Sequence, residues 1–494
     1  MMRRIQHWIN GSTVDGTGDV ELPVFDPATG ERQAVVVAAT PEEVRAAVAA
    51  ARTAFPGWRA ASLSRRAEVM FRFRELVDAN RKEIATLISA EHGKTVADAL
   101  GELARGIENI EFAAGAPALL KGGFTEQASS GVDVYSIRQP LGVVAGITPF
   151  NFPAMVPMWM FCTALVAGNT FVLKPSEKDP SVSLLLADLL RQAGAPPGVF
   201  NVVQGNAIAV EALLADPDVE AVSFVGSTPV ARHIYETGTR NGKRVQALGG
   251  AKNHMVVLPD ADVGAAADAA VSAGYGSAGE RCMAVSVVVA VGAVADPLVA
   301  AIAERIGNIR VGPANDPDAE MGPLISREHR DRVASYLAGD GGDVVVDGRS
   351  AQVANGPGFF LGPSLVDNVA TGSGYYTDEI FGPVLSVVRV SSYDEAVRLV
   401  NDNPYGNGTA IFTRDGGAAR RFQYDAVCGM VGINVPIPVP VAYYSFGGWK
   451  ASLFGDLHMY GPEGLAFYTR TKVVTARWPD PATSTVDLGF PKVR

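Results

Sequence analysis

The sequence predicts an α/β fold: a doubly wound parallel-sheet domain, a second α/β domain and a small β arm outside both. From residue 143 onward, short apolar runs alternate with helical stretches, the pattern of right-handed β-α-β crossovers. A second alternation begins near Met255. Two stretches in which apolar and polar residues alternate, Val132–Arg138 and Thr469–Trp478, predict antiparallel strands for the arm.

Individual elements follow from the same patterns. The strands predicted for the first sheet are Val143–Ile147, Thr170–Leu173, Phe200–Val203, Ala221–Val225 and Val245–Leu248. The helices between them lie near 154–168, 181–193, 206–215 and 229–238. Flanking amphipathic helices are predicted within Pro41–Trp58, Leu63–Asn80 and Arg81–Leu119. The second region has strands near Met255–Leu258 and Val285–Val291, and helices near 261–275 and 298–306.

The composition is typical of a globular protein and argues against a nucleic-acid-binding, disulfide-rich or metal-binding protein. With 494 residues, 48% hydrophobic and 19% charged, the chain is long enough for two or three lobes with substantial cores. A net charge of −10 argues against nucleic acid as a partner. Three scattered cysteines and no visible signal peptide predict a cytoplasmic protein without disulfides. The six histidines show no metal-ligand spacing, so no metal site is predicted.

The stretch Leu141–Leu173 carries no charged residue over 33 positions, which is long enough to cross a bilayer. Pro149, Pro153 and Pro157 interrupt it, and so we expect a buried strand, loop, helix and strand instead of a membrane span.

Cys282 is the strongest candidate for a nucleophile. It lies in the Gly-rich polar run 276–284, directly after Arg281, whereas Cys162 lies in an apolar run typical of a structural cysteine. An adjacent guanidinium and a helix N-terminus would both favour the reactive thiolate.

Several segments in one order resemble the aldehyde dehydrogenase superfamily over nearly the whole chain. They are Thr148–Pro153, Leu173–Glu177, Phe224–Thr228, the Cys282 loop and Glu379–Pro383. The segments Lys243–Ala247, Gly279–Ala284, Ile433–Pro438 and Gly455–His458 are similar to the CoA-acylating methylmalonate-semialdehyde dehydrogenase branch.

The resemblance implies roles for individual residues. Cys282 would attack an aldehyde carbon, and the Asn151 amide with the Cys282 backbone N–H would stabilise the oxyanion. Lys174 and Glu177 would hold the adenosine ribose of NAD, and Gly226 and Ser227 would lie beside its pyrophosphate. Glu379 and Phe381 would steady the nicotinamide riboside, and Thr148 and Phe150 complete the set of cofactor-binding residues.

One expected acid is missing. Hydrolytic members of the superfamily carry a glutamate in Glu-Leu-Gly-Gly-Lys, but the corresponding positions here are Ala247 or Leu248. Without a general base, which contributes ~10²–10⁴ in rate, water should attack the thioester slowly. The resemblance therefore implies transfer of the acyl group to CoA as cosubstrate; release of a free acid remains the alternative.

Two arginines define the expected substrate. In the resembled branch Arg105 and Arg281 hold a carboxylate beside the reacting carbon, which implies malonate semialdehyde or methylmalonate semialdehyde. Loss of CO₂ would then give acetyl-CoA or propionyl-CoA. Other interpretations are a cysteine hydrolase, for which no histidine is clearly paired with Cys282, and a non-catalytic scaffold.

The resemblance also implies domain limits and assembly. Residues 1–128 and 141–249 would form the NAD-binding domain, and 250–445 the catalytic domain. Residues 129–140 and 465–494 would form an oligomerisation arm and C-terminal tail, in a homotetramer built as a dimer of dimers.

Overall fold

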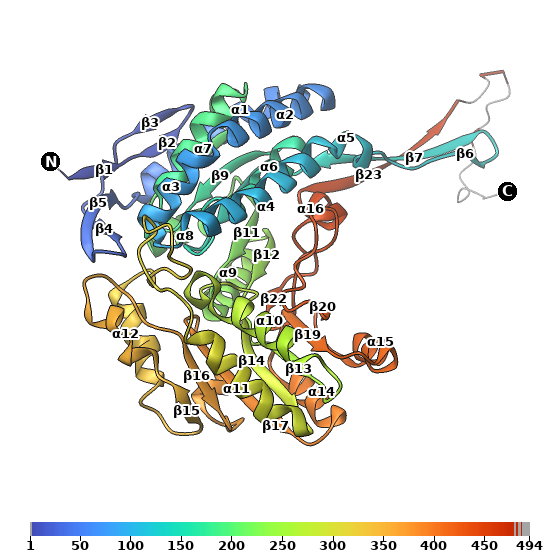
Figure 1. Cartoon of the computed structure of the whole chain (residues 1–494). Helices are drawn as coiled ribbons and strands as arrows, with labels where there is room; N and C mark the ends of the chain where they lie inside the picture. Colours follow the sequence, from blue (N-terminus) through green and yellow to red (C-terminus); the bar gives the residue numbers. More distant parts are fainter. Residues whose placement is uncertain (1, 479–480, 483–485, 487–494) are drawn as a thin grey trace.

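The computed structural model describes residues 2–478, 481–482 and 486, and shows two sheet-based lobes with a long arm projecting from one of them (Figure 1). Most of the predicted C-terminal tail beyond residue 478 lies outside the described residues. The fold class is confirmed: two mainly parallel sheets are covered by helices, and a separate three-stranded sheet forms the arm.

The first sheet has the order β22-β12-β11-β8-β9-β10-β2-β3, and its five central strands are parallel. These are β8 (Val143–Ile147), β9 (Thr170–Lys174), β10 (Phe200–Val202), β11 (Val219–Val225) and β12 (Arg244–Leu248). Short antiparallel strands complete the edges: β22 (Leu453–Phe454), β2 (His7–Ile9) and β3 (Ser12–Val14). All five predicted strands are confirmed, and only β11 begins two residues earlier than predicted.

Helices cover both faces of this sheet. The core of one face contains residues of α2 (Leu63–Ala79), α3 (Arg81–His92), α4 (Val96–Ala114), α6 (Met155–Val166) and α7 (Ser181–Gln192). The core of the other face contains residues of α1 (Pro41–Ala60), α8 (Ala207–Ala215) and α9 (Thr228–Arg240). The predicted helical stretch Arg81–Leu119 is divided into α3, α4 and the short α5 (Ala116–Leu119). The break follows from Gly93, which ends α3 with φ +92°, and from Thr95, whose side chain caps α4.

The uncharged stretch 141–173 forms β8, α6 and β9, as predicted. Every residue of α6 is buried, because the helix packs between the sheet and helix α4. Within the described residues, no helix combines the length and apolar character needed to cross a bilayer.

The second sheet has the order β15-β16-β17-β14-β13-β19-β20. Its strands are β13 (Asn253–Val257), β14 (Val285–Val291), β15 (Asp343–Val346), β16 (Ser364–Asp367), β17 (Val384–Val390), β19 (Gly408–Phe412) and β20 (Met430–Ile433). All neighbours are parallel except β15 and β16. Helices packed around this sheet include α10 (Val263–Tyr275), α11 (Ala295–Ile306), α12 (Arg327–Tyr336), α14 (Tyr393–Asp402) and α15 (Gly416–Asp425).

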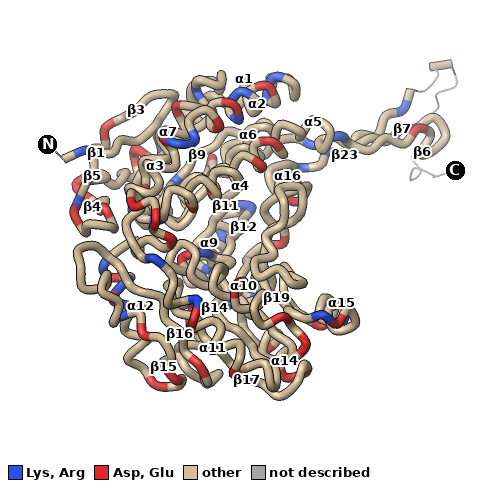
Figure 2. Tube along the Cα trace, in the orientation of Figure 1, with Lys and Arg blue, Asp and Glu red and all other residues tan. Residues whose placement is uncertain are grey.

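The arm is an antiparallel sheet of β6 (Phe124–Ser129), β7 (Val132–Pro140) and β23 (Thr469–Arg477). Thr469 pairs with Pro140 and Arg477 with Val132, so the two predicted strands are confirmed as direct partners. The arm begins at Phe124, inside the range that the resemblance assigns to the NAD-binding domain. Acidic and basic residues are interspersed over the helices in the view of Figure 2.

The order of the first sheet reverses at β8: β9 and β10 extend it to one side, and β11 and β12 to the other. In doubly wound sheets, ligands bind beside the carboxyl ends of the strands at such a switch point. The loops after β8 and β11 therefore define the place where the site is expected.

Candidate active site

A cleft of about 980 Å³ opens at this switch point and extends towards the second sheet. It is lined by all eight predicted cofactor residues and both predicted catalytic residues: Thr148, Phe150, Asn151, Lys174, Glu177, Gly226, Ser227, Cys282, Glu379 and Phe381. The structure thus brings together residues separated by up to 233 positions in the chain.

At the end of β9, Lys174 is buried and its Nζ lies 3.4 Å from Glu177 Oε2. Burial lowers the pKa of Lys174, and the Glu177 carboxylate partly opposes this shift. The Glu177 side chain is 35% exposed, so its carboxylate has room to accept further hydrogen bonds from a ligand in the cleft.

After β11, Gly226 and Ser227 lead into helix α9, whose first residues are Thr228 and Pro229. A Cβ at Gly226 would lie 2.5 Å from Cζ of the Phe224 ring, so a larger residue at this position would require that ring to shift. Ser227 makes no side-chain hydrogen bond to the first turn, so the N-terminus of α9 keeps free N–H groups beside the cleft. Such a terminus favours an anionic ligand.

Glu379 and Phe381 reach the cleft from the loop before β17. Glu379 Oε1 accepts a 2.9 Å hydrogen bond from the Ala251 backbone N–H, and burial raises the pKa of Glu379 to about 7. Phe381 has φ +56°, and its carbonyl accepts a 2.7 Å hydrogen bond from Nε2 of His329. The Phe381 ring meets the Phe150 ring edge-on at 5.9 Å.

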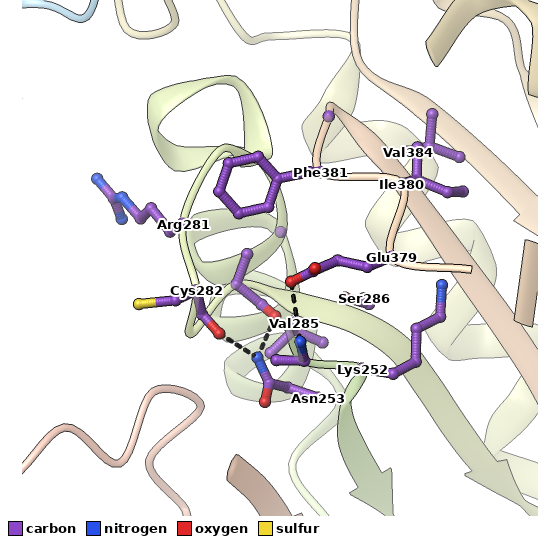
Figure 3. A pocket seen from close by; sticks show the side chains of 15 residues that line it. Lys252, Asn253, Arg281, Cys282, Val285, Ser286, Glu379, Ile380, Phe381 and Val384 are labelled. Carbon is purple, nitrogen blue, oxygen red and sulfur yellow. Dashed lines mark hydrogen bonds between the residues drawn. The ribbon is translucent and has the colours of Figure 1, made fainter. Parts of the chain in front are cut away.

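Cys282 lies in a turn just before β14 and is half-buried. Two asparagine side chains, Asn253 and Asn407, donate hydrogen bonds of 3.0 and 3.1 Å to its carbonyl oxygen. Figure 3 shows the Cys282 sulfur directed away from Asn253 and away from the Glu379 carboxylate. The backbone of Cys282, the candidate nucleophile, is therefore anchored on one side, while its side chain lines the cleft.

The expectation that the neighbourhood of Cys282 favours the thiolate is wrong for the protein without ligands. Burial raises the pKa of Cys282 to about 12, and the negative charge of Glu379 adds to this effect. Arg281 has only a small opposing influence, because its guanidinium forms a 2.5 Å ion pair with Asp98. No helix begins at Cys282 either: α10 ends at Tyr275, and a 3₁₀ turn ends at Gly279.

Asn151 is buried, and its Nδ2 donates a 3.0 Å hydrogen bond to the Glu280 carbonyl, two residues before Cys282. An amide nitrogen carries two hydrogens, so one remains for an oxygen atom on a substrate. The loop after β8 and the Cys282 loop are thus tied together at the point where an oxyanion would form.

The missing acid is a feature of the structure as well as of the sequence. Ala247 and Leu248 lie at the end of β12 and are both buried, with apolar side chains. The acidic side chain whose charge raises the pKa of Cys282 is Glu379, and its carboxylate accepts a hydrogen bond from the Ala251 N–H.

The two predicted substrate arginines do not line the main cleft. Arg281 lines a small pocket behind Cys282 and pairs with Asp98. Arg105 pairs with Glu108 at 2.9 Å and donates hydrogen bonds of 2.9 and 3.2 Å to the carbonyls of Pro440 and Val439. Both guanidinium groups have protein partners that a substrate carboxylate would have to replace.

Sequence reasoning missed several buried polar residues around the site. Lys94 Nζ donates a 2.6 Å hydrogen bond to the Asn151 carbonyl and forms a 3.0 Å ion pair with Glu102. Glu280 is completely buried, and burial raises its pKa to about 8. Nothing in the sequence pattern connected Lys94 with Asn151, because the two residues lie 57 positions apart in the chain.

Comparison with known proteins identifies the family of this chain. The model of the aldehyde dehydrogenase family matches residues 13–474. The chain is 54% identical to a malonate-semialdehyde dehydrogenase of Pseudomonas aeruginosa, over 98% of both chains. It is 46% identical to the mitochondrial, acylating methylmalonate-semialdehyde dehydrogenase of Arabidopsis thaliana, over 99% of this chain and 81% of the relative.

A solved structure resembles this chain in both fold and sequence. A protein of Sinorhizobium meliloti 1021, crystallised in complex with NAD, superimposes with a TM-score of 0.96 at 51% identity. The match covers 98% of this chain and all of the other. On its sequence, its fold and the cleft at its switch point, this chain belongs to the aldehyde dehydrogenase family.

Proposed function

We propose that this protein is an NAD-dependent, CoA-acylating dehydrogenase of methylmalonate semialdehyde and malonate semialdehyde. The observation that carries the proposal is the convergence of Cys282 and Asn151 on one cleft, with no acid at Ala247 or Leu248. Relatives that match nearly the whole of this chain and carry the name malonate-semialdehyde dehydrogenase or acylating methylmalonate-semialdehyde dehydrogenase support the choice of substrate.

The residues of the cleft fit NAD. The N-terminus of α9 offers uncapped N–H groups to the pyrophosphate, and the half-exposed Glu177 carboxylate can accept ribose hydroxyls. The Thr148 hydroxyl, which has no hydrogen-bond partner in the described part of the chain, is a further candidate contact. Glu379 and Phe381 line the end of the cleft that also contains Cys282. When bound there, NAD supplies the acceptor for the hydride of the aldehyde.

Cys282 provides the covalent step. Its sulfur, once deprotonated, attacks the aldehyde carbon, and the carbonyl oxygen takes up the negative charge. The free N–H of the Asn151 amide and the Cys282 backbone N–H stabilise that oxygen. Loss of the aldehyde hydrogen as hydride restores the carbonyl and leaves a thioester on Cys282.

The second half of the reaction uses the thiol of CoA. The side chains at 247 and 248 are apolar, so the chain offers no group there to activate water. The CoA thiolate attacks the thioester carbonyl, and the Cys282 thiolate leaves. The remaining carboxylate lies β to a thioester carbonyl, which accepts the electrons as an enolate when CO₂ departs. The α-carbon then takes up a proton from solvent, and the products are propionyl-CoA or acetyl-CoA.

Arg105 and Arg281 are the proposed partners of the substrate carboxylate. Guanidinium groups bind carboxylates through paired hydrogen bonds. Arg281 is adjacent to the nucleophile, and a substrate carboxylate would compete with Asp98 for it. Arg105 would give up its hydrogen bonds to the carbonyls of Val439 and Pro440 and donate to the substrate carboxylate instead.

We also propose a homotetramer, built as a dimer of dimers, in which the β6-β7-β23 arm contributes to subunit pairing. The arm projects from the body (Figure 1) and exposes apolar side chains, including Phe124 at 66% and Val473 at 64%. An extended sheet with free edges and exposed apolar residues is suited to association. The cytoplasmic location and the domain limits given above stay predictions.

The test is product analysis. Purified protein is mixed with NAD, CoA and each semialdehyde in turn, and NADH absorbance and the acyl product are recorded by spectrophotometry and mass spectrometry. We expect steady NADH formation only with CoA, and propionyl-CoA or acetyl-CoA as product. Equal steady rates without CoA, with a free acid as product, would refute acyl transfer, and activity in Cys282→Ser would refute the thioester.

A further inference from the structure

Beyond the residues that contact substrate or cofactor, we infer that the buried ion pair Lys94–Glu102 positions Asn151 for oxyanion stabilisation. This inference rests on the proposed role of Asn151. Lys94 and Glu102 are positioning residues: neither of them lines the cleft, and they act through the loop that carries the amide.

Lys94 holds the beginning of the loop. Its ammonium group donates a 2.6 Å hydrogen bond to the backbone carbonyl of Asn151 and lies 4.5 Å from the centre of the Phe152 ring. Its side chain has no exposed surface. A buried ammonium group needs all its donors satisfied, so its position is determined by Asn151, Phe152 and its ionic partner.

Glu102 holds the end of the same loop. Oε2 forms the 3.0 Å ion pair with Lys94, while Oε1 accepts hydrogen bonds of 2.8 and 3.0 Å from the backbone N–H groups of Ala154 and Met155. Ala154 is the N-cap residue of α6 and Met155 is its first residue, and this helix has no side-chain cap of its own. The Glu102 carboxylate therefore takes the place of an N-cap.

The pair connects these two contacts. Through this pair, the Lys94 ammonium group fixes residue 151 and the Glu102 carboxylate fixes residues 154–155. Both parts of the loop are thereby held relative to α4, the helix that carries Glu102. The same helix carries Asp98, which pairs with Arg281 beside the nucleophile, and Arg105. Asn151 in turn donates to the Glu280 carbonyl, so the position of the amide relative to Cys282 depends on the Lys94–Glu102 pair.

If Lys94 had only a structural role, its substitution would reduce stability alone. A positioning role predicts in addition that the NADH burst becomes slower, and that this effect disappears when Asn151 is absent. We therefore propose a double-mutant cycle with Lys94→Met, Asn151→Ala and the double variant. The readout is the single-turnover burst of NADH with saturating NAD and semialdehyde, together with the Kd for NAD. Lys243→Met is the matched control, because Lys243 is also a buried lysine that donates to backbone carbonyls, those of Asp216 and Val219.

A misplacement of about 1 Å at a reacting group can cost ~10²-fold, and loss of an oxyanion donor ~10²–10³-fold. We expect Lys94→Met to slow the burst by ~10- to 10²-fold with an unchanged Kd for NAD, and to have less than a roughly twofold effect in the Asn151→Ala background. Lys243→Met should lower the melting temperature without slowing the burst. Lys94→Arg, which keeps the charge and the donors, should recover part of the rate.

Independent, multiplicative effects of Lys94→Met and Asn151→Ala would overturn the inference. If Lys94→Met does not fold, Glu102→Gln serves instead, because its amide oxygen can still accept from Ala154 and Met155 while the ionic partner of Lys94 is lost. An unchanged burst in Glu102→Gln would then overturn it. Failure of the proposed function would look different from failure of this inference. If the proposed reaction is wrong, the wild-type protein shows no NADH burst; if the proposed role of Asn151 is wrong, Asn151→Ala leaves the burst unaffected.

Discussion

The environment of the Cys282 thiol leads to a testable prediction about its protonation and reactivity. Burial raises the pKa of Cys282 to about 12, so at pH 8 only ~10⁻⁴ of the thiol is ionised, compared with about a quarter of an ordinary cysteine. A thiolate of higher pKa is intrinsically more nucleophilic, which recovers roughly 40-fold of this deficit. We expect iodoacetamide to alkylate Cys282 about 10²-fold more slowly than a free exposed thiol at pH 8.

The pH profile is the better assay, because it needs no reference thiol. Between pH 7 and pH 10 the alkylation rate should rise about tenfold per unit without reaching a plateau. The rate is followed by mass spectrometry of the peptide that contains Cys282, and circular dichroism verifies the fold at each pH. Cys282→Ser gives the background from Cys162 and Cys428, both of which are buried.

Addition of NAD extends the test. The nicotinamide ring carries a positive charge, and a ring held beside Glu379 would lower the pKa of Cys282 and accelerate alkylation at pH 8, unless it covers the sulfur. A rate that levels off below about pH 9 in the ligand-free protein would refute the reasoning, since it would mean that the thiol is solvated.

Four further outcomes are expected. Glu379→Gln removes a negative charge near Cys282 and keeps an acceptor for the Ala251 N–H, so alkylation at pH 8 should become faster; an unchanged rate would contradict the electrostatic assignment. Arg105→Ala should raise KM for methylmalonate semialdehyde by ~10- to 10²-fold and leave KM for propanal unchanged in steady-state assays. Glu177→Gln should increase the ratio of kcat/KM for NADP to that for NAD, since the carboxylate would repel a 2′-phosphate, and an unchanged ratio would place the ribose elsewhere. Burial lowers the pKa of His254 from 6.5 to about 3, so between pH 6.5 and pH 3 this histidine is protonated in the unfolded chain but not in the folded protein. The free energy of unfolding should therefore fall as pH falls below 6.5, by up to about 1.4 kcal/mol per pH unit. The melting temperature of His254→Phe should depend less on pH over this range.

Much of the fold could be predicted from local patterns. The five central strands of the first sheet and helices such as α7 and α9 lie within two residues of their predicted limits, because apolar periodicity and length distinguish strands from helices in alternating segments. The division of 81–119 was missed, because Gly93 and Thr95 are weak signals within an otherwise helical pattern. Short edge strands such as β22 could not be predicted, since two residues show no periodicity.

The composition of the candidate site was also accessible, because motifs that resemble the aldehyde dehydrogenase family indicated Asn151 and Lys174, and a Gly-rich polar run indicated Cys282. The electrostatic state of the site was not. Arg281 is adjacent to Cys282 in sequence, but its charge is compensated by Asp98, which lies 183 residues away. The prediction that the polar loop around Cys282 favours the thiolate was wrong, because the solvent exposure of a side chain cannot be judged from its neighbours in the sequence alone.

The amino-acid sequence alone determines the α/β class, the choice of Cys282 as candidate nucleophile and the absence of an acid at positions 247 and 248, since these depend on residue types and short-range order. Only the tertiary structure decides that Lys94 and Glu102 hold the Asn151 loop, that Asp98 occupies Arg281, and that burial keeps Cys282 protonated. The physical reason is that charge pairing and desolvation depend on distances in space, and those distances are created when elements far apart in the chain pack together.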